Sequence, residues 1–187
     1  MKTRESGMPE EGVWATFFTP EEVLHKLRLP ALGDVGDFGC GYGTFAIPAA
    51  QITSGMVHAL DIDPEMVTAT AAKADALPNV RVYVRDFVTD GSGLPDVSVN
   101  YVMLFNILHA ERPDELLREA YRILIPSGRV GIVHWNYDFT TPRGPSMDIR
   151  PRSEQCCERA IREGFWLLAP GIVRLPPYHY GMVLERP

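Results

Sequence analysis

Three glycines at alternate positions make DFGCGYGTF, residues 37–45, the segment of this sequence best suited to bind a ligand. Gly39, Gly41 and Gly43 follow a short strand-like run and precede a stretch of helical composition. Glycine adopts backbone angles that other residues avoid, and it leaves no side chain between a ligand and the backbone amides. A tight turn without a ligand needs fewer glycines. The segment therefore predicts a strand-to-helix loop that a ligand approaches closely.

An aspartate suited to bind a ribose stands 20 positions after Gly41. Asp61 lies near the end of the second strand-like run, MVHALDID, and a carboxylate there can accept hydrogen bonds from both ribose hydroxyls. Its neighbour Asp63 precedes Pro64, and Asp followed by Pro is typical of a helix start. We therefore assign Asp61 to the ligand and Asp63 to the helix cap.

Two further features narrow the kind of ligand. The dinucleotide motif G-x-G-x-x-G requires its third glycine at position 44, where this chain has Thr44, so the spacing disfavours a nicotinamide cofactor. The third strand-like run ends in VRDF, where Asp86 can accept a hydrogen bond from an exocyclic amine and Phe87 can cover a flat ring. The alternative for VRDF is an acidic surface turn beside a core aromatic residue.

The elements that must position these residues alternate between strand-like and helical patterns, which predicts a doubly wound α/β sheet. Strands are expected at 35–38, 56–63, 80–86, 99–105, 129–135, 165–175 and 178–185, and helices at 19–27, 44–52, 64–77, 113–124 and 153–164. Thr19 and Glu22 form a candidate capping box, and IPSG, residues 125–128, is a candidate turn. Pro176 and Pro177 mark a short connection, so the last strand should run antiparallel.

The composition is that of a soluble globular protein, and the cysteine content leads us to expect a cytoplasmic location. The chain has 187 residues, of which 45% are hydrophobic and 22% charged, and its formal net charge of −6 disfavours a nucleic-acid partner. No run approaches the length that spans a bilayer, so no membrane insertion is expected. Three cysteines, two of them adjacent, make no disulfide framework and form no metal-ligand spacing with the histidines. We expect no bound metal.

The length predicts a single domain over residues 1–187. Within it we expect an N-terminal segment and helix at 1–29, a ligand-binding core at 30–135, and a substrate-side loop with the C-terminal strands at 136–187. The loop at 136–152 is long and holds three prolines, and long ordered loops in compact domains are usually functional or mobile.

Taken in order, DFGCGYG, ALDIDPEM, VRDF and LFNILHA with PDELLREAYRILIPSGRVGIV closely resemble the class I S-adenosylmethionine-dependent methyltransferases. The similarity runs from about residue 30 to 135, and its last part is most similar to the small-molecule branch that includes quinone-biosynthesis methyltransferases. The resemblance implies a Rossmann-like, doubly wound sheet of seven strands, mostly parallel with an antiparallel last strand, and helices on both faces. It also implies S-adenosylmethionine as cofactor and S-adenosylhomocysteine as product.

The same resemblance implies which residues bind the cofactor. The glycine loop lies against the methionine part of the cofactor, Asp61 binds the ribose, and Asp86 meets the adenine amine. The N-terminal aromatic residues VWATFF could close over the cofactor as a lid or serve as a hydrophobic staple for the helix that follows. The full set of expected cofactor-binding residues is Asp37, Phe38, Gly39, Cys40, Gly41, Gly43, Asp61, Ile62, Asp86, Phe87, Phe105, Asn106 and Phe18.

The acceptor side carries no decisive motif. Candidates follow the fourth and fifth strands, where ligands gather in such sheets. His109 is the best candidate for a general base, while His134 sits within a strand and fits a satisfied interior histidine. The residues expected to line the acceptor pocket are Trp14, His109, Trp135 and Tyr137, with Glu111 and Asp138 as further polar candidates.

The sequence thus predicts a methyltransferase that transfers a methyl group to a small-molecule acceptor by in-line displacement. Two alternatives remain open: a non-catalytic S-adenosylmethionine-binding regulatory protein, and an NAD(P)-dependent oxidoreductase. The atom that is methylated and the oligomeric state are not determined by the sequence.

Overall fold

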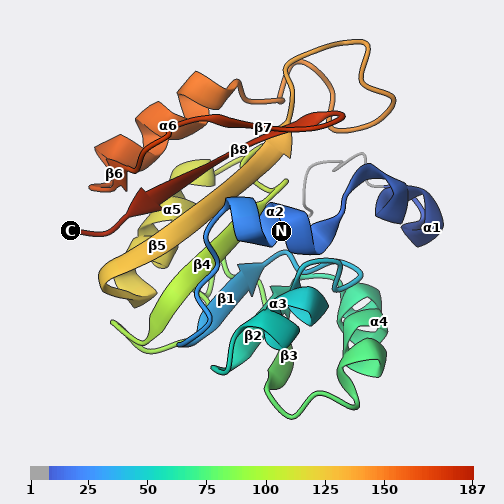
Figure 1. Ribbon diagram of the computed structural model, residues 1–187, viewed down its shortest axis with the longest axis vertical. Helices are drawn as coiled ribbons and strands as arrows, with labels where there is room; N and C mark the ends of the chain where they lie inside the picture. The colour runs from blue at the N-terminus through green and yellow to red at the C-terminus, as the bar shows by residue number, and fades with distance from the viewer. Residues whose placement is uncertain (1–8) are drawn as a thin grey trace.

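A mixed β-sheet with helices on both faces forms the centre of the molecule (Figure 1). The computed structural model describes residues 9–187, so the part of the expected N-terminal lid in residues 1–8 lies outside the described chain. The strands are β1 (Val35–Phe38), β2 (Val57–Asp61), β3 (Val80–Val84), β4 (Val99–Phe105), β5 (Leu124–Trp135), β6 (Trp166–Leu167), β7 (Val173–Leu175) and β8 (His179–Glu185). The helices are α1 (Glu11–Trp14), α2 (Pro20–Lys26), α3 (Ala46–Ile52), α4 (Pro64–Ala74), α5 (Pro113–Ile123) and α6 (Ser153–Arg162), with a short 3-10 turn η1 (Ala15–Phe17).

The strand order is β3-β2-β1-β4-β5-β8-β6, and β7 pairs separately with β8. Strands β1 to β5 pair in parallel, whereas β8 runs antiparallel to β5. This confirms the predicted Rossmann-like sheet with an antiparallel last strand. The strand count is eight in residues 9–187 rather than seven. The strand expected at 165–175 is broken into β6 and β7, because Pro170 cannot donate a ladder hydrogen bond and Gly171 adopts a positive φ of 89°.

Two layers of side chains pack the sheet against its helices, because successive residues of a strand point to opposite faces. On one face, strand residues Phe38, Val102, Leu104 and Ile132 join a cluster with side chains of α5 and α6. On the other face, Val35, Tyr101, Met103 and Val133 join a cluster with α2 and α3. Figure 1 shows these helix pairs on opposite sides of the sheet. Burial on both faces explains why β4 is almost wholly apolar.

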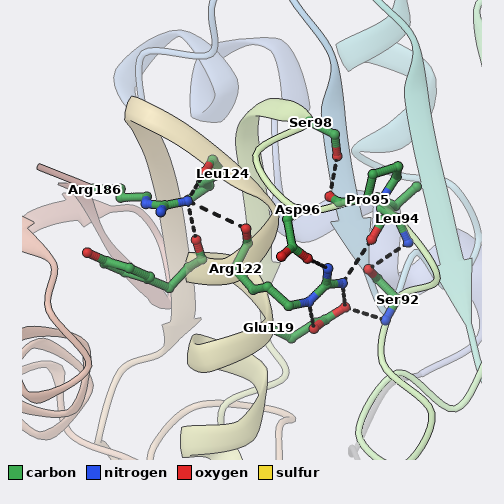
Figure 2. A network of polar contacts seen from close by, with 10 residues as sticks. Ser92, Leu94, Pro95, Asp96, Ser98, Glu119, Arg122, Leu124 and Arg186 are labelled. Carbon is green, nitrogen blue, oxygen red and sulfur yellow. Dashed lines mark hydrogen bonds and ion pairs between the residues drawn. The ribbon is translucent and has the colours of Figure 1, made fainter.

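A polar network fixes the C-terminal end of α5 relative to the loop before β4 and to the end of β8 (Figure 2). Arg122 donates to both carboxylate oxygens of Glu119 at 2.8 and 2.7 Å, to the Leu94 carbonyl at 2.9 Å, and to Asp96. Arg186, just after β8, donates to the carbonyls of Tyr121 and Leu124 where α5 ends. A cation there satisfies carbonyls left open at a helix C-terminus and complements the helix dipole.

Two local predictions differ from the structure. The turn expected at 125–128 lies within β5, because Val99 pairs with Leu124 and Tyr101 with Arg129, so that these residues bulge out of one continuous strand. Helix α2 begins at Pro20 after Thr19, as expected, but the Thr19 side chain makes no cap hydrogen bond, so the capping box with Glu22 was wrong. The Asp63 cap of α4 is confirmed, since its carboxylate accepts from the Glu65 N–H at 2.9 Å.

Candidate active site

The glycine loop follows β1 and is tied to the end of β2. The N–H groups of Gly39 and Cys40 donate to the Leu60 carbonyl at 2.8 and 3.0 Å. The Gly41 N–H donates to Asp61 Oδ2 at 2.8 Å, and the Gly41 carbonyl accepts from the Thr70 hydroxyl of α4 at 2.7 Å. Gly41 has a positive φ of 51°, which requires glycine or strain. The loop is therefore held in one shape by two neighbouring elements.

Asp61 has both carboxylate oxygens engaged with the backbone. Oδ1 accepts from the Asp63 N–H at 3.0 Å, and Oδ2 accepts from Gly41. Burial raises the pKa of Asp61, and these two hydrogen bonds act in the opposite direction. Each carboxylate oxygen has two acceptor positions, so Asp61 can still receive hydroxyl groups from a ligand.

Asp37, in β1, carries a buried oxygen without a partner. Its side chain is buried, and Oδ2 has no hydrogen-bond partner among the described residues. Burial, and then the nearby charge of Asp61, raises the pKa of Asp37 to about 7. Two carboxyl groups that face one cavity in this way are suited to a positively charged ligand group. A cation would offset both the cost of burying a carboxylate and the repulsion between Asp37 and Asp61.

A cavity lies over the carboxyl ends of β1, β2, β4 and β5, the edge of such sheets where ligands bind. One half is lined by the loop and by β2 and α4; its residues are Asp37, Gly39, Cys40, Gly41, Tyr42, Thr44, Asp61, Ile62, Asp63, Met66 and Phe87. The other half follows β4 and β5; its residues are Trp14, Phe45, Phe105, Asn106, Ile107, His109, Ala110 and Trp135.

Nine of the thirteen expected cofactor-binding residues line this cavity, and four do not: Phe38, Gly43, Asp86 and Phe18. Phe38 is fully buried in the core and stacks behind Phe87, with ring centroids 5.2 Å apart. Asp86 does not line the cavity, because its carboxylate accepts from the N–H and hydroxyl of Thr89 at 3.1 and 3.0 Å. Gly43 faces α4, where an added Cβ would lie 3.1 Å from Thr70.

The N-terminal aromatic residues pack over the acceptor half. Trp14 lines the cavity and lies 6.1 Å from Trp135 between ring centroids. Phe18 does not line it directly; it packs on Phe45 at 5.1 Å and on His179 at 4.4 Å. In front of the loop, Lys73 of α4 pairs with Glu11 of α1 and donates to the Tyr42 carbonyl at 2.6 Å.

The candidates after β4 and β5 separate into two groups. His109 lines the cavity, and its Nδ1 lies 3.3 Å from Nε2 of His134, which is fully buried behind it. Tyr137 lies outside the cavity, is 39% exposed, and stacks under the Arg152 guanidinium at 3.7 Å. The expectation that Tyr137 lines the acceptor pocket is therefore corrected: the chain turns outward after Trp135 and takes Tyr137 with it.

Glu111 and Asp138 do not line the cavity either. Asp138 accepts from the N–H and hydroxyl of Thr140, both at 2.8 Å, and so shapes the loop at 136–152. Sequence reasoning also missed Met66 and Ile107, which line the cavity. Their positions in the sequence could have identified them, because Met66 follows the end of β2 at Asp61 and Ile107 follows the end of β4 at Phe105.

Comparison with known proteins agrees with this geometry. Residues 35–128 match a family described as a methyltransferase domain. A 37.1 kDa protein of transposon Tn4556 from Streptomyces fradiae is 30% identical over 132 residues, which cover 68% of this chain and 38% of that protein. A methyltransferase-like protein of Schizosaccharomyces pombe is 27% identical over 138 residues, covering 74% of this chain and 50% of that protein. The chain thus spans half or less of the length of these two relatives.

The fold has a close counterpart among solved structures. A SAM-dependent methyltransferase from Aquifex aeolicus superposes with a TM-score of 0.82 and 23% identity, covering 91% of both chains. The superposition covers 91% of the chain and so most of the sheet. The glycine loop and its hydrogen bond to Asp61 lie within residues 35–128, the region that the family matches. The chain belongs to the methyltransferase-domain family, with the fold of the class I S-adenosylmethionine-dependent methyltransferases.

Proposed function

We propose that this protein transfers a methyl group from S-adenosylmethionine to a small-molecule acceptor. The observation that carries the proposal is the placement of two buried carboxyl groups in one cavity, with Asp61 holding the glycine loop and Asp37 presenting an unpartnered oxygen. S-adenosylmethionine brings ribose hydroxyls, an ammonium group and a positively charged sulfur. The residues present fit that combination.

The residues that would hold the cofactor come from four elements. Asp61 would receive the ribose hydroxyls, and Asp37 would face the cationic part of the molecule. Ile62, Met66 and Phe87 would cover the adenine ring with apolar surface. When bound, the cofactor supplies a methyl group that is already activated by its bond to a cationic sulfur.

The work left to the chain is to position the acceptor and to exclude water. Orienting two bound reactants can supply several kcal/mol, on the order of 7–11 kcal/mol in favourable cases. Trp14 and Trp135 close the acceptor half with apolar surface, and Trp135 is 1% exposed. We propose His109 as the residue that takes a proton when the acceptor must lose one during attack.

The N-terminal segment fits a cover over this cavity. Trp14 lines the cavity, and the contacts of Lys73 with Glu11 and Tyr42 join α1 and the glycine loop to α4. We propose that residues 1–29 act as the lid, 30–135 as the cofactor-binding core and 136–187 as the substrate side, within one domain. Residues 1–8 of that lid lie outside the described chain.

A small acceptor is favoured by the enclosed, largely apolar acceptor half and by the net charge of −6, which disfavours a nucleic-acid substrate. None of the helices in residues 9–187 is long and apolar enough to cross a membrane. A cytoplasmic location and a place in the quinone-biosynthesis branch stay predictions from the sequence.

The experiment that tests the proposal measures S-adenosylhomocysteine released from S-adenosylmethionine with a broad panel of small acceptors. Release that depends on an acceptor, and that is lost in Asp61→Asn, would support the proposal. Tight binding of the cofactor with no release across the panel would favour a non-catalytic regulatory protein. Binding of NADH in place of S-adenosylmethionine would favour an oxidoreductase.

A further inference from the structure

Asn106, expected from the sequence to bind the cofactor, presents a hydrogen-bond donor and an acceptor in the half of the cavity that we assign to the acceptor. Neither Nδ2 nor Oδ1 of its buried amide has a partner among the described residues, and Asn106 lines the cavity just after β4. Its backbone has a positive φ of 55°, held by the hydrogen bond from its N–H to the Val133 carbonyl at 2.7 Å. A buried amide left unsatisfied in a strained conformation is costly, and such costs gather at ligand sites.

His109 stands three positions further along and is braced from behind. Its Nδ1 and the Nε2 of His134 lie 3.3 Å apart, so one ring donates a hydrogen bond to the other. Burial, and then the neighbouring His109 and His179, hold the pKa of His134 well below its usual value, so His134 stays neutral. A neutral His134 can accept a hydrogen bond from the Nδ1–H of His109 or donate its own Nε2–H to that nitrogen, so His109 can carry its proton on either ring nitrogen.

The acceptor half holds no charged side chain among the described lining residues other than the titratable His109. The charged side chains that line the cavity, within residues 9–187, are Asp37, Asp61 and Asp63, all acidic and all in the cofactor half. A carboxylate or phosphate on the acceptor would find no cation there, and an unpaired buried charge is costly. The acceptor should therefore be uncharged.

The wall of this half is aromatic. Trp14 and Trp135 form one continuous surface, since centroids 6.1 Å apart leave no room for a ring between them. Phe105 and Phe45 also line this half, with centroids 4.8 Å apart and edge-on rings. Such a wall suits a flat ring packed against it from the cavity.

We propose that the acceptor is an uncharged aromatic compound whose nucleophile is a ring hydroxyl. The hydroxyl donates to His109 and accepts from Asn106 Nδ2, and the ring packs on the tryptophan wall. A hydroxyl is chosen because it can donate its single proton to His109 and at the same time accept from Asn106 Nδ2, whereas a carboxylate only accepts and an ammonium group only donates. This inference rests on the proposed function.

The transfer conserves atoms and charge among the acceptor, His109 and the proposed cofactor. The O–H bond of the acceptor breaks and its proton passes to His109. The oxygen forms a bond to the methyl carbon while the carbon–sulfur bond breaks, leaving that electron pair on the sulfur.

Calorimetric titrations of the full chain, saturated with S-adenosylhomocysteine, test the acceptor class directly. The probes are p-cresol, toluene, p-toluate and 4-methylbenzylammonium, which share one ring and differ in the polar group. We expect p-cresol to bind at least tenfold tighter than toluene, and p-toluate and the ammonium compound to bind more weakly than p-cresol. Equal binding of p-cresol and toluene, or tighter binding of either charged probe, would overturn the inference.

Variants test whether Asn106 and His109 are the residues that bind the acceptor hydroxyl. In Asn106→Leu the ratio of p-cresol to toluene affinity should fall below threefold, and in His109→Phe it should fall as well. Trp166→Phe, on the exposed edge strand β6 with a side chain 64% exposed, is the matched control and should keep the wild-type ratio. An unchanged ratio in both site variants would reject the inference.

The first titration, with S-adenosylhomocysteine alone, distinguishes failure of the proposed function from failure of the acceptor inference. If S-adenosylhomocysteine binds but the phenol preference is absent, the acceptor inference fails and the proposed function stands. If S-adenosylhomocysteine does not bind at all, the proposed function fails and the acceptor inference fails with it.

Discussion

The carboxylate of Asp61 accepts a hydrogen bond from the backbone N–H of Gly41 across 2.8 Å. The residue expected to bind the ribose therefore also fixes the loop expected to lie along the rest of the cofactor. One side chain connects the ends of β1 and β2, and changes to it should affect binding more than a single ligand contact would.

Asp61→Asn should weaken S-adenosylhomocysteine binding at least tenfold. The substitution puts an amide where a charged acceptor meets the Gly41 N–H, and hydrogen bonds to charged groups contribute about 1.5–3 kcal/mol each. Calorimetry measures the affinity. Asp75→Asn is the control, because Asp75 is exposed at the C-terminal end of α4 and does not line the cavity, and its affinity should change less than threefold. Equal losses in the two variants would remove the special role of Asp61.

Asp37→Asn should stabilise the unliganded protein at pH 8 more than at pH 5. The folded-state pKa of Asp37, about 7, exceeds the unfolded value of 3.8, so the folded state binds the extra proton and its stability falls as the pH rises from about 4 to 7. Above pH 7 the loss is complete, on the order of 4 kcal/mol. Asparagine removes this titration.

Urea unfolding of wild type and Asp37→Asn at both pH values checks the prediction. The same variant should bind S-adenosylmethionine more weakly, because the cationic part of the cofactor loses its carboxylate partner. A stability difference that does not change between pH 5 and pH 8 would contradict the raised pKa.

Gly144→Ala should destabilise the loop at 136–152 and disturb the acceptor wall. Gly144 has a positive φ of 109°, and an added Cβ would lie 2.9 Å from the Trp135 ring and from the Arg150 guanidinium. Arg150 donates to the Pro145 carbonyl at 3.0 and 2.8 Å and to several other loop carbonyls, so the loop has little freedom to yield.

We expect a loss of about 1–3 kcal/mol in the free energy of unfolding for Gly144→Ala. Faster proteolysis within residues 136–152 should accompany it. Gly12→Ala is the control, because an added Cβ there meets nothing within 4 Å. If both variants unfold at the same denaturant concentration as wild type, the loop does not support Trp135 as described.

Arg186→Met should lower the free energy of unfolding by about 1–3 kcal/mol, because the carbonyls that end α5 lose their donor (Figure 2). Methionine keeps the apolar length of the side chain and removes the guanidinium. Arg174→Met, at an exposed position of β7, is the matched control and should change stability by less than about 0.5 kcal/mol. Urea unfolding of both variants measures these changes. Equal, small changes in the two variants would mean that Arg186 contributes only a surface charge and does not cap α5.

The sequence predicted those parts of the fold that short-range signals determine. Strand β1 at 35–38 and the Asp63 cap follow from local pattern and helix-start chemistry, and both are confirmed. The break between β6 and β7 was missed because an apolar run hides a turn at Pro170 and Gly171. The bulge at 125–128 depends on the register between β4 and β5, which pairs residues far apart in the chain.

The candidate site was predictable where a motif carries its residues in fixed order, as the glycine loop and Asp61 do. Phe38 and Phe87 could not be told apart from sequence, since both are aromatic residues near strand ends and only packing puts one behind the other. The contact between His109 and His134 depends on two neighbouring strands, and neither residue carries a local signal for it.

Calorimetric titration of the purified protein with S-adenosylhomocysteine, beside a parallel titration with NADH, tests the central claim most directly. The account predicts micromolar binding of S-adenosylhomocysteine, no binding of NADH, and at least tenfold weaker binding of S-adenosylhomocysteine to Asp61→Asn. Binding of NADH alone would contradict it and make the glycine loop a dinucleotide site. Binding of neither ligand would mean that the loop, although held by Asp61, does not receive this cofactor.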